Sequence, residues 1–277
     1  MDFNDANYHS FPAISASGIN CFLNYGAAAY WANSPFNINR QPEEKSEALI
    51  MGSLTHMLVL ESSEKFDASY IIIPEGMRRD KRSKDYYELL EQAETGKKDL
   101  VTAKMHQEAK VMAEALLKNK VARQIMQEGT YEEPMLWERD GIKCKIKTDF
   151  FRKGLIVDYK TTRENTPEDY FRAAANLGYH RAAAWYLDGV EAVKGTRPQG
   201  MLHIVQNKDY PENIGFPVFT KEMIEAGTVE NEFAFAEICK RLLSGDWSDW
   251  PQKIINAAFP EWYKLKGQHN ADNQNGE

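Results

Sequence analysis

The chain has few cysteines and no long apolar run, and these absences exclude several classes of protein. Its three cysteines, Cys21, Cys144 and Cys239, lie far apart and match neither a zinc-binding spacing nor a disulfide framework. The longest apolar runs are as short as Ile71-Ile72-Ile73 and Leu155-Ile156-Val157, so we expect no membrane-spanning segment. The first residues contain neither a basic stretch nor an apolar core, which predicts no secretory signal and a cytoplasmic protein.

The chain also lacks an excess of positive charge. It has 34 Lys and Arg against 41 Asp and Glu, a net charge of −7. A general nucleic-acid coat protein is usually basic, so this balance argues against that class, although an enzyme could still contact DNA through a local basic lining. Two clusters could form such a lining: Arg78, Arg79, Lys81, Arg82 and Lys84 in one segment, and Lys143, Lys145 and Lys147 in another.

With 277 residues, of which 43% are hydrophobic and 27% charged, the chain has an ordinary globular composition. We expect one α/β domain over residues 1–266 and a polar, disordered tail over residues 267–277. No internal repeat is present. Periodicity and cap residues predict helices at 18–25, 46–61, near 86–90, from Thr102 to about Gly129, at 167–193 with a break at Gly178, and at 220–243. They predict strands at 132–138, 142–151, 155–160, 200–206 and 214–219.

The segment from 142 to 160 carries the most informative pattern. Polar and apolar residues alternate strictly along its first part, which predicts a half-buried strand. A short turn at Lys153-Gly154 and a second apolar run follow, so the two parts predict a β-hairpin with Gly154 at positive φ. This two-residue loop places Asp149 directly opposite Asp158, and strand alternation puts Lys160 on the same face.

Two carboxylates that face each other destabilise a hairpin unless a cation lies between them. A divalent metal bound by oxygen atoms would supply that cation, and Mg²⁺ suits carboxylates together with a substrate phosphate. The ion lowers the pKa of a bound water, and an adjacent lysine such as Lys160 can orient that water or stabilise charge in the transition state. The pattern therefore indicates phosphodiester hydrolysis; the alternative is a surface hairpin with scattered charges.

Further motifs lie on either side of this hairpin. Gly52-Ser-Leu-Thr-His56 occurs on a predicted apolar helix upstream, and Tyr186 occurs on a predicted helix downstream. Together with Asp149 and Asp158-Tyr-Lys160-Thr-Thr, in this order, they make the chain resemble the RecB-type PD-(D/E)xK nucleases, and among these most closely the RecE-like exonucleases (exonuclease VIII). The similarity runs nearly end to end. It implies an α/β fold with a restriction-endonuclease-like core, a mixed central sheet flanked by helices, and an N-terminal helical portion.

The resemblance also implies a function. RecE-like enzymes use Mg²⁺, for which Mn²⁺ can substitute, to degrade linear double-stranded DNA 5′ to 3′ and leave a 3′ single-stranded tail for recombination. They form a homotetrameric ring and act beside a RecT-like single-strand annealing protein, often phage-encoded. Two alternatives stay open: a nuclease of this fold with another polarity or with single-stranded DNA as substrate, and a non-catalytic scaffold that binds DNA ends.

The resemblance assigns roles to individual residues. It makes Lys160, Asp158, Asp149 and Tyr186 catalytic, and His56, Asp149, Asp158 and the main-chain carbonyl of Tyr159 metal ligands. Glu132 and His180 are additional candidates, and Arg78, Arg79, Lys84, Lys143, Lys145 and Lys147 are expected to contact DNA. One departure is Ala182, where the family usually carries a glutamine four residues before the tyrosine; His180 or Arg181 could take over its role.

Overall fold

The structure is a computed structural model, and it describes residues 3–4, 7–41, 46–61, 63–152, 154–260 and 263. The chain divides into two compact units, Met1–Trp247 and Ser248–Glu277. The predicted domain of residues 1–266 and the predicted tail of residues 267–277 stay predictions, because residues 264–277 lie outside the described part. Within that part, no helix combines the length and the apolar character that a bilayer span requires.

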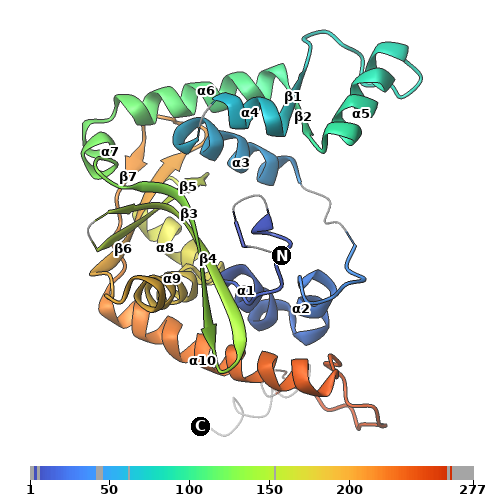
Figure 1. Cartoon of the computed structure of the whole chain (residues 1–277), viewed down its shortest axis with the longest axis vertical. Coiled ribbons are helices and arrows are strands. Elements are labelled where there is room, and N and C mark those ends of the chain that lie inside the picture. The colour runs from blue at the N-terminus through green and yellow to red at the C-terminus, as the bar shows by residue number, and fades with distance from the viewer. Residues whose placement is uncertain are drawn as a thin grey trace, which may run out of the picture. The chain divides into compact units, whose positions relative to one another are not determined.

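A five-stranded mixed sheet lies at the centre of the first unit (Figure 1). In spatial order its strands are β3 (Thr130–Arg139), β4 (Ile142–Arg152), β5 (Leu155–Thr162), β6 (Gly200–Asn207) and β7 (Ile214–Gly215). All neighbouring strands are antiparallel except β5 and β6, which are parallel. Parallel neighbours need a long crossover, and two helices between β5 and β6 supply it.

The predicted hairpin register between β4 and β5 is confirmed. Phe150 pairs with Val157, and Arg152 pairs with Leu155 at the turn. Gly154 has a φ of 83°, the left-handed conformation that the short loop was predicted to need. Because local turn geometry sets the register of a hairpin, this part of the fold follows directly from the sequence.

The crossover consists of α8 (Pro167–Asn176) and α9 (Tyr179–Lys194), which break at Gly178 as predicted. Gly178 has a φ of 69°, and a Cβ there would lie 2.4 Å from the Oδ1 of Asn20. Both facts require glycine at this position. The helix α10 (Lys221–Ser244) crosses α9 closely, since a Cβ on Gly227 would lie 2.3 Å from the carbonyl oxygen of His180.

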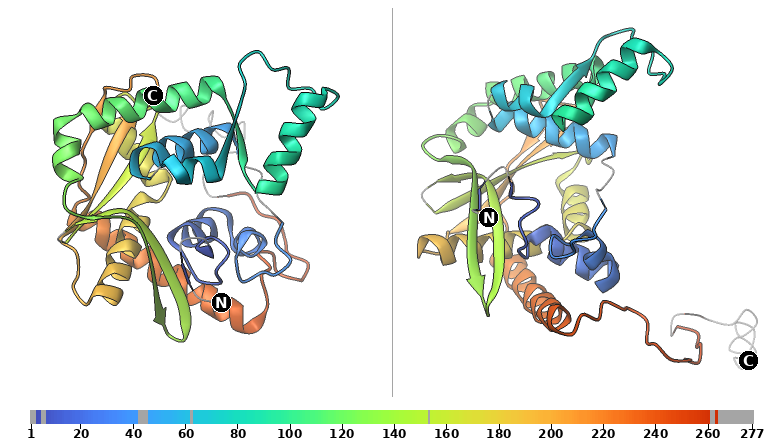
Figure 2. Two further views of the ribbon diagram at one scale, coloured as in Figure 1. Left: turned by 45° about the horizontal axis from the view of Figure 1, so that its top comes forward. Right: turned by 45° about the vertical axis from the view of Figure 1, so that its right-hand side comes forward.

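Helices cover both faces of the sheet (Figure 2). On one side α3 (Glu47–Leu60), α6 (Ala103–Lys118) and α7 (Lys120–Ile125) pack on strand residues that include Val157 and Leu202. On the other side α9 and α10 pack on residues that include Ile156 and Met201. Consecutive residues of β5 and β6 thus enter opposite core clusters, as strand alternation requires.

The N-terminal part contains α1 (Ala16–Tyr25), which Ser15 caps, and α2 (Ala27–Asn33). Between α3 and α6 the chain forms α4 (Ser63–Ser69), α5 (Lys84–Gly96) and a small parallel sheet of β1 (Tyr70–Ile73) and β2 (Asp99–Thr102). The elements α2, α4, β1 and β2 were not predicted. The two strands pair across an intervening helix, and such pairing leaves no local sequence signal.

Two predicted elements differ in length. The helix expected from Thr102 to about Gly129 ends at Lys118, and α7 then starts, because the side chain of Asn119 accepts hydrogen bonds from the N–H groups of Val121 and Ala122. An asparagine at a helix N-cap starts a new helix in this way. The strand expected at 214–219 is limited to β7.

Candidate active site

A row of polar side chains crosses four neighbouring strands. Tyr131 pairs with Phe150 and Glu133 with Thr148, so Glu132 on β3 lies opposite Asp149 on β4. Phe150 pairs with Val157, so the next residues along, Asp149 and Asp158, face each other across β4 and β5. On β6, His203 is the direct partner of Asp158. The row therefore reads Glu132, Asp149, Asp158, His203.

The β4–β5 ladder opens at this row. Its paired residues run from the turn to Phe150 and Val157, and beyond them the N–H of Tyr159 donates instead to the Oδ2 of Asp149 at 2.8 Å. In an extended strand the N–H and C=O of one residue point to the same neighbouring strand. The carbonyl of Tyr159 therefore also points toward the β4 side, where a metal could use it.

Glu132 has a strained backbone. Its φ is 50°, in the left-handed region that non-glycine residues seldom adopt, and the residue is only 7% exposed. Its Oε2 lies 2.5 Å from the Nζ of Lys147, and its Oε1 lies 3.3 Å from the Nδ1 of His56. Strain of about 1–3 kcal/mol is typical of functional sites, so this conformation supports a role for Glu132 in the site.

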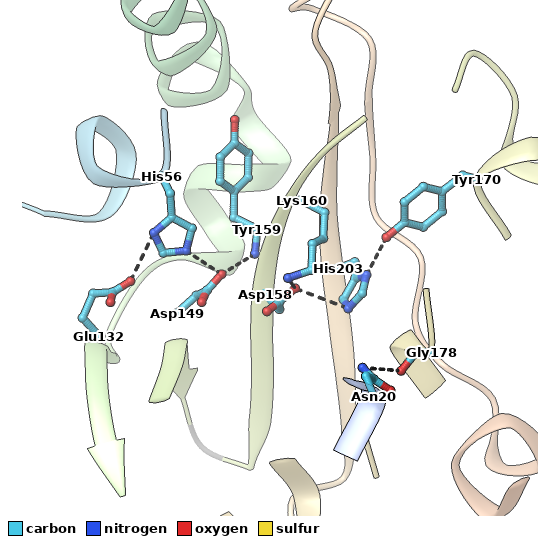
Figure 3. Close-up of polar contacts among 10 residues, drawn as sticks. All are labelled: Asn20, His56, Glu132, Asp149, Asp158, Tyr159, Lys160, Tyr170, Gly178 and His203. Carbon is cyan, nitrogen blue, oxygen red and sulfur yellow. Dashed lines mark hydrogen bonds and ion pairs between the residues drawn. The ribbon is translucent and has the colours of Figure 1, made fainter. Parts of the chain in front are cut away.

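His56 on α3 lies between two carboxylates (Figure 3). Its Nε2 is 2.8 Å from the Oδ2 of Asp149, and its Nδ1 faces Glu132. Burial opposes protonation of the imidazole, but Asp149 and Glu132 outweigh it and raise the pKa of His56 to about 9. Burial likewise opposes ionisation of Asp149, but His56 and Lys160 lower the pKa of its carboxyl to about 2. The imidazolium thus supplies positive charge among these acids.

Lys160 contacts Asp158 on the same strand. Its Nζ lies 2.6 Å from the Oδ2 of Asp158, and Asp158 is 4% exposed. Burial, assisted by the charge of Asp149, raises the pKa of Asp158 to about 6 although Lys160 opposes it. Burial disfavours the ammonium, but Asp158 and Asp149 outweigh it and raise the pKa of Lys160. The three predicted groups are therefore brought together, with two carboxylates sharing one lysine.

A cleft of about 780 Å³ lies beside these residues, and Asp158 is covered from it. His56, Glu132, Asp149, Lys160 and Tyr186 all line it, so the predicted Tyr186 is near the acidic row. Burial, with smaller effects from Tyr8 and the acids, raises the pKa of the Tyr186 hydroxyl, which stays protonated. The cleft lining also includes residues that were not predicted: Tyr8, Glu61, Lys97 and Tyr179.

Two of these residues add to the chemistry of the site. The ring of Tyr179 lies 5.4 Å from the Nζ of Lys160 and covers the lysine. Glu61, at the end of α3, has a carboxylate oxygen within 4.8 Å of ligand atoms of His56 and Glu132. Neither residue has a motif of its own, because Tyr179 follows a helix break and Glu61 follows a helix end.

The unpredicted His203 is buried, and burial with nearby Lys160 holds its pKa well below the usual value, so the imidazole is neutral.

Other predicted residues lie away from this cleft. His180 lies 3.4 Å from Glu230, and Arg181 contacts Glu230 and Asn24, so both face neighbouring helices rather than the acidic row. Ala182 packs against the core. None of Arg78, Arg79 and Lys84 belongs to the cleft lining; Arg78 lies 3.7 Å from Asp80 and Lys84 lies 3.7 Å from Glu88. Their contact with DNA stays a prediction.

The three lysines of β4 have different environments. Lys147 reaches the site through Glu132, and Lys143 is exposed with its Nζ 5.2 Å from the ring centre of Phe11. Lys145 was expected to contact DNA, but its position does not allow this. It is 3% exposed, and its ammonium donates to the carbonyls of Tyr8 and Phe11 at 2.6 and 2.8 Å. Lys145 therefore fastens the N-terminal segment to the sheet.

Lys145 and Lys143 allow a matched test of this correction. Lys145→Met removes two charge-assisted hydrogen bonds and leaves two carbonyls without a donor, so we expect the free energy of unfolding to fall by about 2 kcal/mol. Lys143→Met, on the same face of the strand but with an exposed side chain, should change it by less than about 0.5 kcal/mol. Urea denaturation measures both. Equal effects of the two substitutions would contradict the fastening role.

The donor set fits a divalent cation that prefers oxygen. Carboxylates of Asp149 and Glu132 contact the imidazole of His56, the carboxylate of Glu61 lies within 4.8 Å of ligand atoms of His56 and Glu132, and Asp158 follows on the next strand. This donor set is suited to Mg²⁺ or Mn²⁺. In addition, the Oε1 of Glu132 is buried and makes no hydrogen bond to any described residue, and the positive charge that faces it is the imidazolium of His56 at 3.3 Å. A buried carboxylate oxygen is costly without such a charge, and a metal ion could take over this role.

Comparison with known proteins identifies the family of the chain and supports its fold. The sequence model of the family described as PDDEXK-like domain of unknown function (DUF3799) matches residues 15–248, so the chain belongs to that family. Among solved structures, a candidate exonuclease from Eubacterium rectale is similar, with 18% identity, 88% of each chain covered and a TM-score of 0.58. No curated protein matches the chain. The predicted restriction-endonuclease-like fold is confirmed, and closeness to RecE-like enzymes stays a prediction.

Proposed function

We propose that this PDDEXK-like protein is a Mg²⁺-dependent exodeoxyribonuclease that degrades one strand of linear double-stranded DNA from its 5′ end. The product is a duplex with a 3′ single-stranded tail, the substrate of recombination by strand annealing. The observation that supports this most is the row of Glu132, Asp149 and Asp158 with Lys160 against Asp158, beside a cleft. Oxygen donors with an adjacent ammonium are the groups that phosphodiester hydrolysis needs.

Each residue of the site has a role in this proposal. Asp149, Asp158, the carbonyl of Tyr159 and His56, whose imidazolium would give up its proton on binding, would hold Mg²⁺, and Mn²⁺ would substitute. When bound, the ion lowers the pKa of a water and polarises a phosphoryl oxygen. The ammonium of Lys160, fixed at 2.6 Å from Asp158, orients the attacking water and stabilises the charge that develops on the phosphorane.

The rest of the cleft suits a single DNA strand. Lys97 and Lys147 add positive charge to its lining, and lysines at such positions contact phosphates without reading sequence. Tyr8, Tyr179 and Tyr186 provide aromatic surface on which bases or sugars can pack. Ala182 offers no polar group, so His180 and Arg181 would have to leave Glu230 to replace the missing glutamine.

End-labelled duplexes test the proposal. With a linear duplex that carries label on the 5′ end, Mg²⁺ should release labelled mononucleotide at once, because hydrolysis starts at that end. With label on the 3′ end, the label should stay in a strand that shortens only from its 5′ end, so labelled mononucleotide should not appear early. Chelation by EDTA should stop both changes, and a covalently closed circular duplex of equal mass is the matched substrate control.

Other outcomes of this experiment would support the alternative functions. Early release of 3′ label would show the opposite polarity, and faster loss of single-stranded than of duplex DNA would identify a single-strand nuclease. Tight binding of DNA ends without any Mg²⁺- or Mn²⁺-dependent cleavage would favour a non-catalytic scaffold. The homotetrameric ring and the RecT-like annealing partner rest on the family resemblance alone and stay predictions.

A further inference from the structure

We propose that His203 and Tyr170 are a positioning pair that fixes the Asp158 carboxylate for metal binding. The inference rests on the proposed function, because it assigns Asp158 to the metal. Neither residue belongs to the D…DxK pattern, and neither lines the cleft. They lie on the β6 side of Asp158, where His203 is its direct strand partner.

The three side chains form a continuous chain of contacts (Figure 3). The Nε2 of His203 lies 3.4 Å from the Oδ2 of Asp158, and its Nδ1 lies 2.5 Å from the hydroxyl oxygen of Tyr170. The exposed fractions are 4% for Asp158, 1% for His203 and 6% for Tyr170. A polar chain so well shielded from water has strong electrostatic interactions, and its geometry matters accordingly.

The direction of this chain follows from the chemistry of its ends. An ionised carboxylate can only accept, so a neutral imidazole that carries its hydrogen on Nε2 presents a donor to Asp158 at 3.4 Å, although this contact lacks hydrogen-bond geometry in the structure. Nδ1 is then the acceptor, and the Tyr170 hydroxyl donates to it. Tyr170 thereby selects the histidine tautomer that attracts Asp158. The Oδ2 of Asp158 faces both His203 and Lys160, so its other oxygen, Oδ1, would be the one available to a metal.

Packing holds the imidazole in this orientation. Its ring meets Phe219 edge-on at 4.7 Å and Tyr179 edge-on at 5.3 Å, between ring centres. The N–H of His203 donates to the carbonyl of Pro217, which fixes the backbone as well. The β5–β6 register sets His203 directly beside Asp158. A group held this firmly restricts the carboxylate to one orientation before any metal arrives, as outer partners of metal ligands do.

A purely structural role would also explain why His203 is buried. Two amide variants distinguish that role from the positioning of Asp158. In His203→Gln the terminal amide nitrogen is as many bonds from Cβ as Nε2 is, so a donor to Asp158 is retained. In His203→Asn the amide oxygen can take the place of Nδ1 and accept from the Tyr170 hydroxyl, so contact with Tyr170 is retained and the donor to Asp158 is lost. Tyr170→Phe removes only the hydroxyl and frees the imidazole to take the other tautomer.

The test is Mn²⁺ binding to the DNA-free full chain by isothermal titration calorimetry, with thermal unfolding of each metal-free variant as a folding control. We expect His203→Asn and Tyr170→Phe to weaken Mn²⁺ binding about tenfold, within the range that loss of an outer partner causes. His203→Gln should stay within about threefold of wild type. Single-turnover cleavage of duplex DNA should fall in the same order.

The outcomes separate this inference from the proposed function. If wild type binds no Mn²⁺, or binds it as weakly as Asp158→Asn, the proposed metal site fails and the positioning role with it. If wild type binds Mn²⁺ but Tyr170→Phe and His203→Asn bind it equally well, only the positioning role is overturned. Should His203→Asn fail to fold, the nearly isosteric Tyr170→Phe decides alone.

Discussion

Asp158→Asn is expected to lower the rate of Mg²⁺-dependent DNA degradation by about 10³-fold or more. The amide keeps the size of the side chain but cannot supply a negatively charged ligand at the point where β4 and β5 separate. A bound divalent cation contributes several kcal/mol of transition-state stabilisation, and each 1.4 kcal/mol corresponds to about tenfold in rate. Single-turnover digestion of an end-labelled duplex measures the loss.

The fold should tolerate this substitution. Asp149 and Asp158 are like charges in a buried place, and Asn removes that repulsion. Lys160 still has the charge of Asp149 nearby. A matched control is Asp209→Asn, which neutralises an exposed carboxylate just beyond β6 and outside the cleft. If Asp158→Asn and Asp209→Asn digest DNA equally fast, the acidic row is not the catalytic centre.

Local rules were sufficient to predict the acidic hairpin. Strand alternation, a two-residue loop and a glycine at positive φ together fixed the β4–β5 register, and this register put Asp149 opposite Asp158. The break at Gly178 followed in the same way from a single residue type. Features that depend on residues close in sequence are the ones that sequence patterns determine best.

Other parts of the site depend on contacts between distant segments. His203 joins the row because β6 pairs in parallel with β5 across a crossover of two helices, and no turn sets that register. Tyr170 comes from the crossover itself. Tyr8 reaches the cleft because the N-terminal segment lies on β4, where Lys145 binds its carbonyls. Alternation correctly put Lys145 and Lys147 on one face, but it contains no information about which chain segment covers that face.

Lys160→Met is expected to separate catalysis from metal binding. The lysine does not ligate the metal in our proposal, so Mn²⁺ affinity should stay at wild-type level or increase, because one positive charge beside a divalent cation is gone. The rate of cleavage should nevertheless fall by about 10²–10³-fold, the loss typical when one preorganised donor to a developing oxyanion is removed. Calorimetry with Mn²⁺ and single-turnover digestion measure the two effects on one protein.

The same variant should depend on metal for its stability. Without Lys160 the buried Asp158 loses the ammonium that lies 2.6 Å away, so the metal-free variant should be less stable than wild type. A divalent cation can replace the missing charge, so Mn²⁺ should raise the melting temperature of Lys160→Met more than that of wild type. Lys160→Arg keeps the charge and should show the smaller, wild-type shift, although its planar guanidinium cannot place a donor where the ammonium does. Cleavage by Lys160→Met at the wild-type rate would mean that the lysine only neutralises the acidic row and has no part in the chemistry.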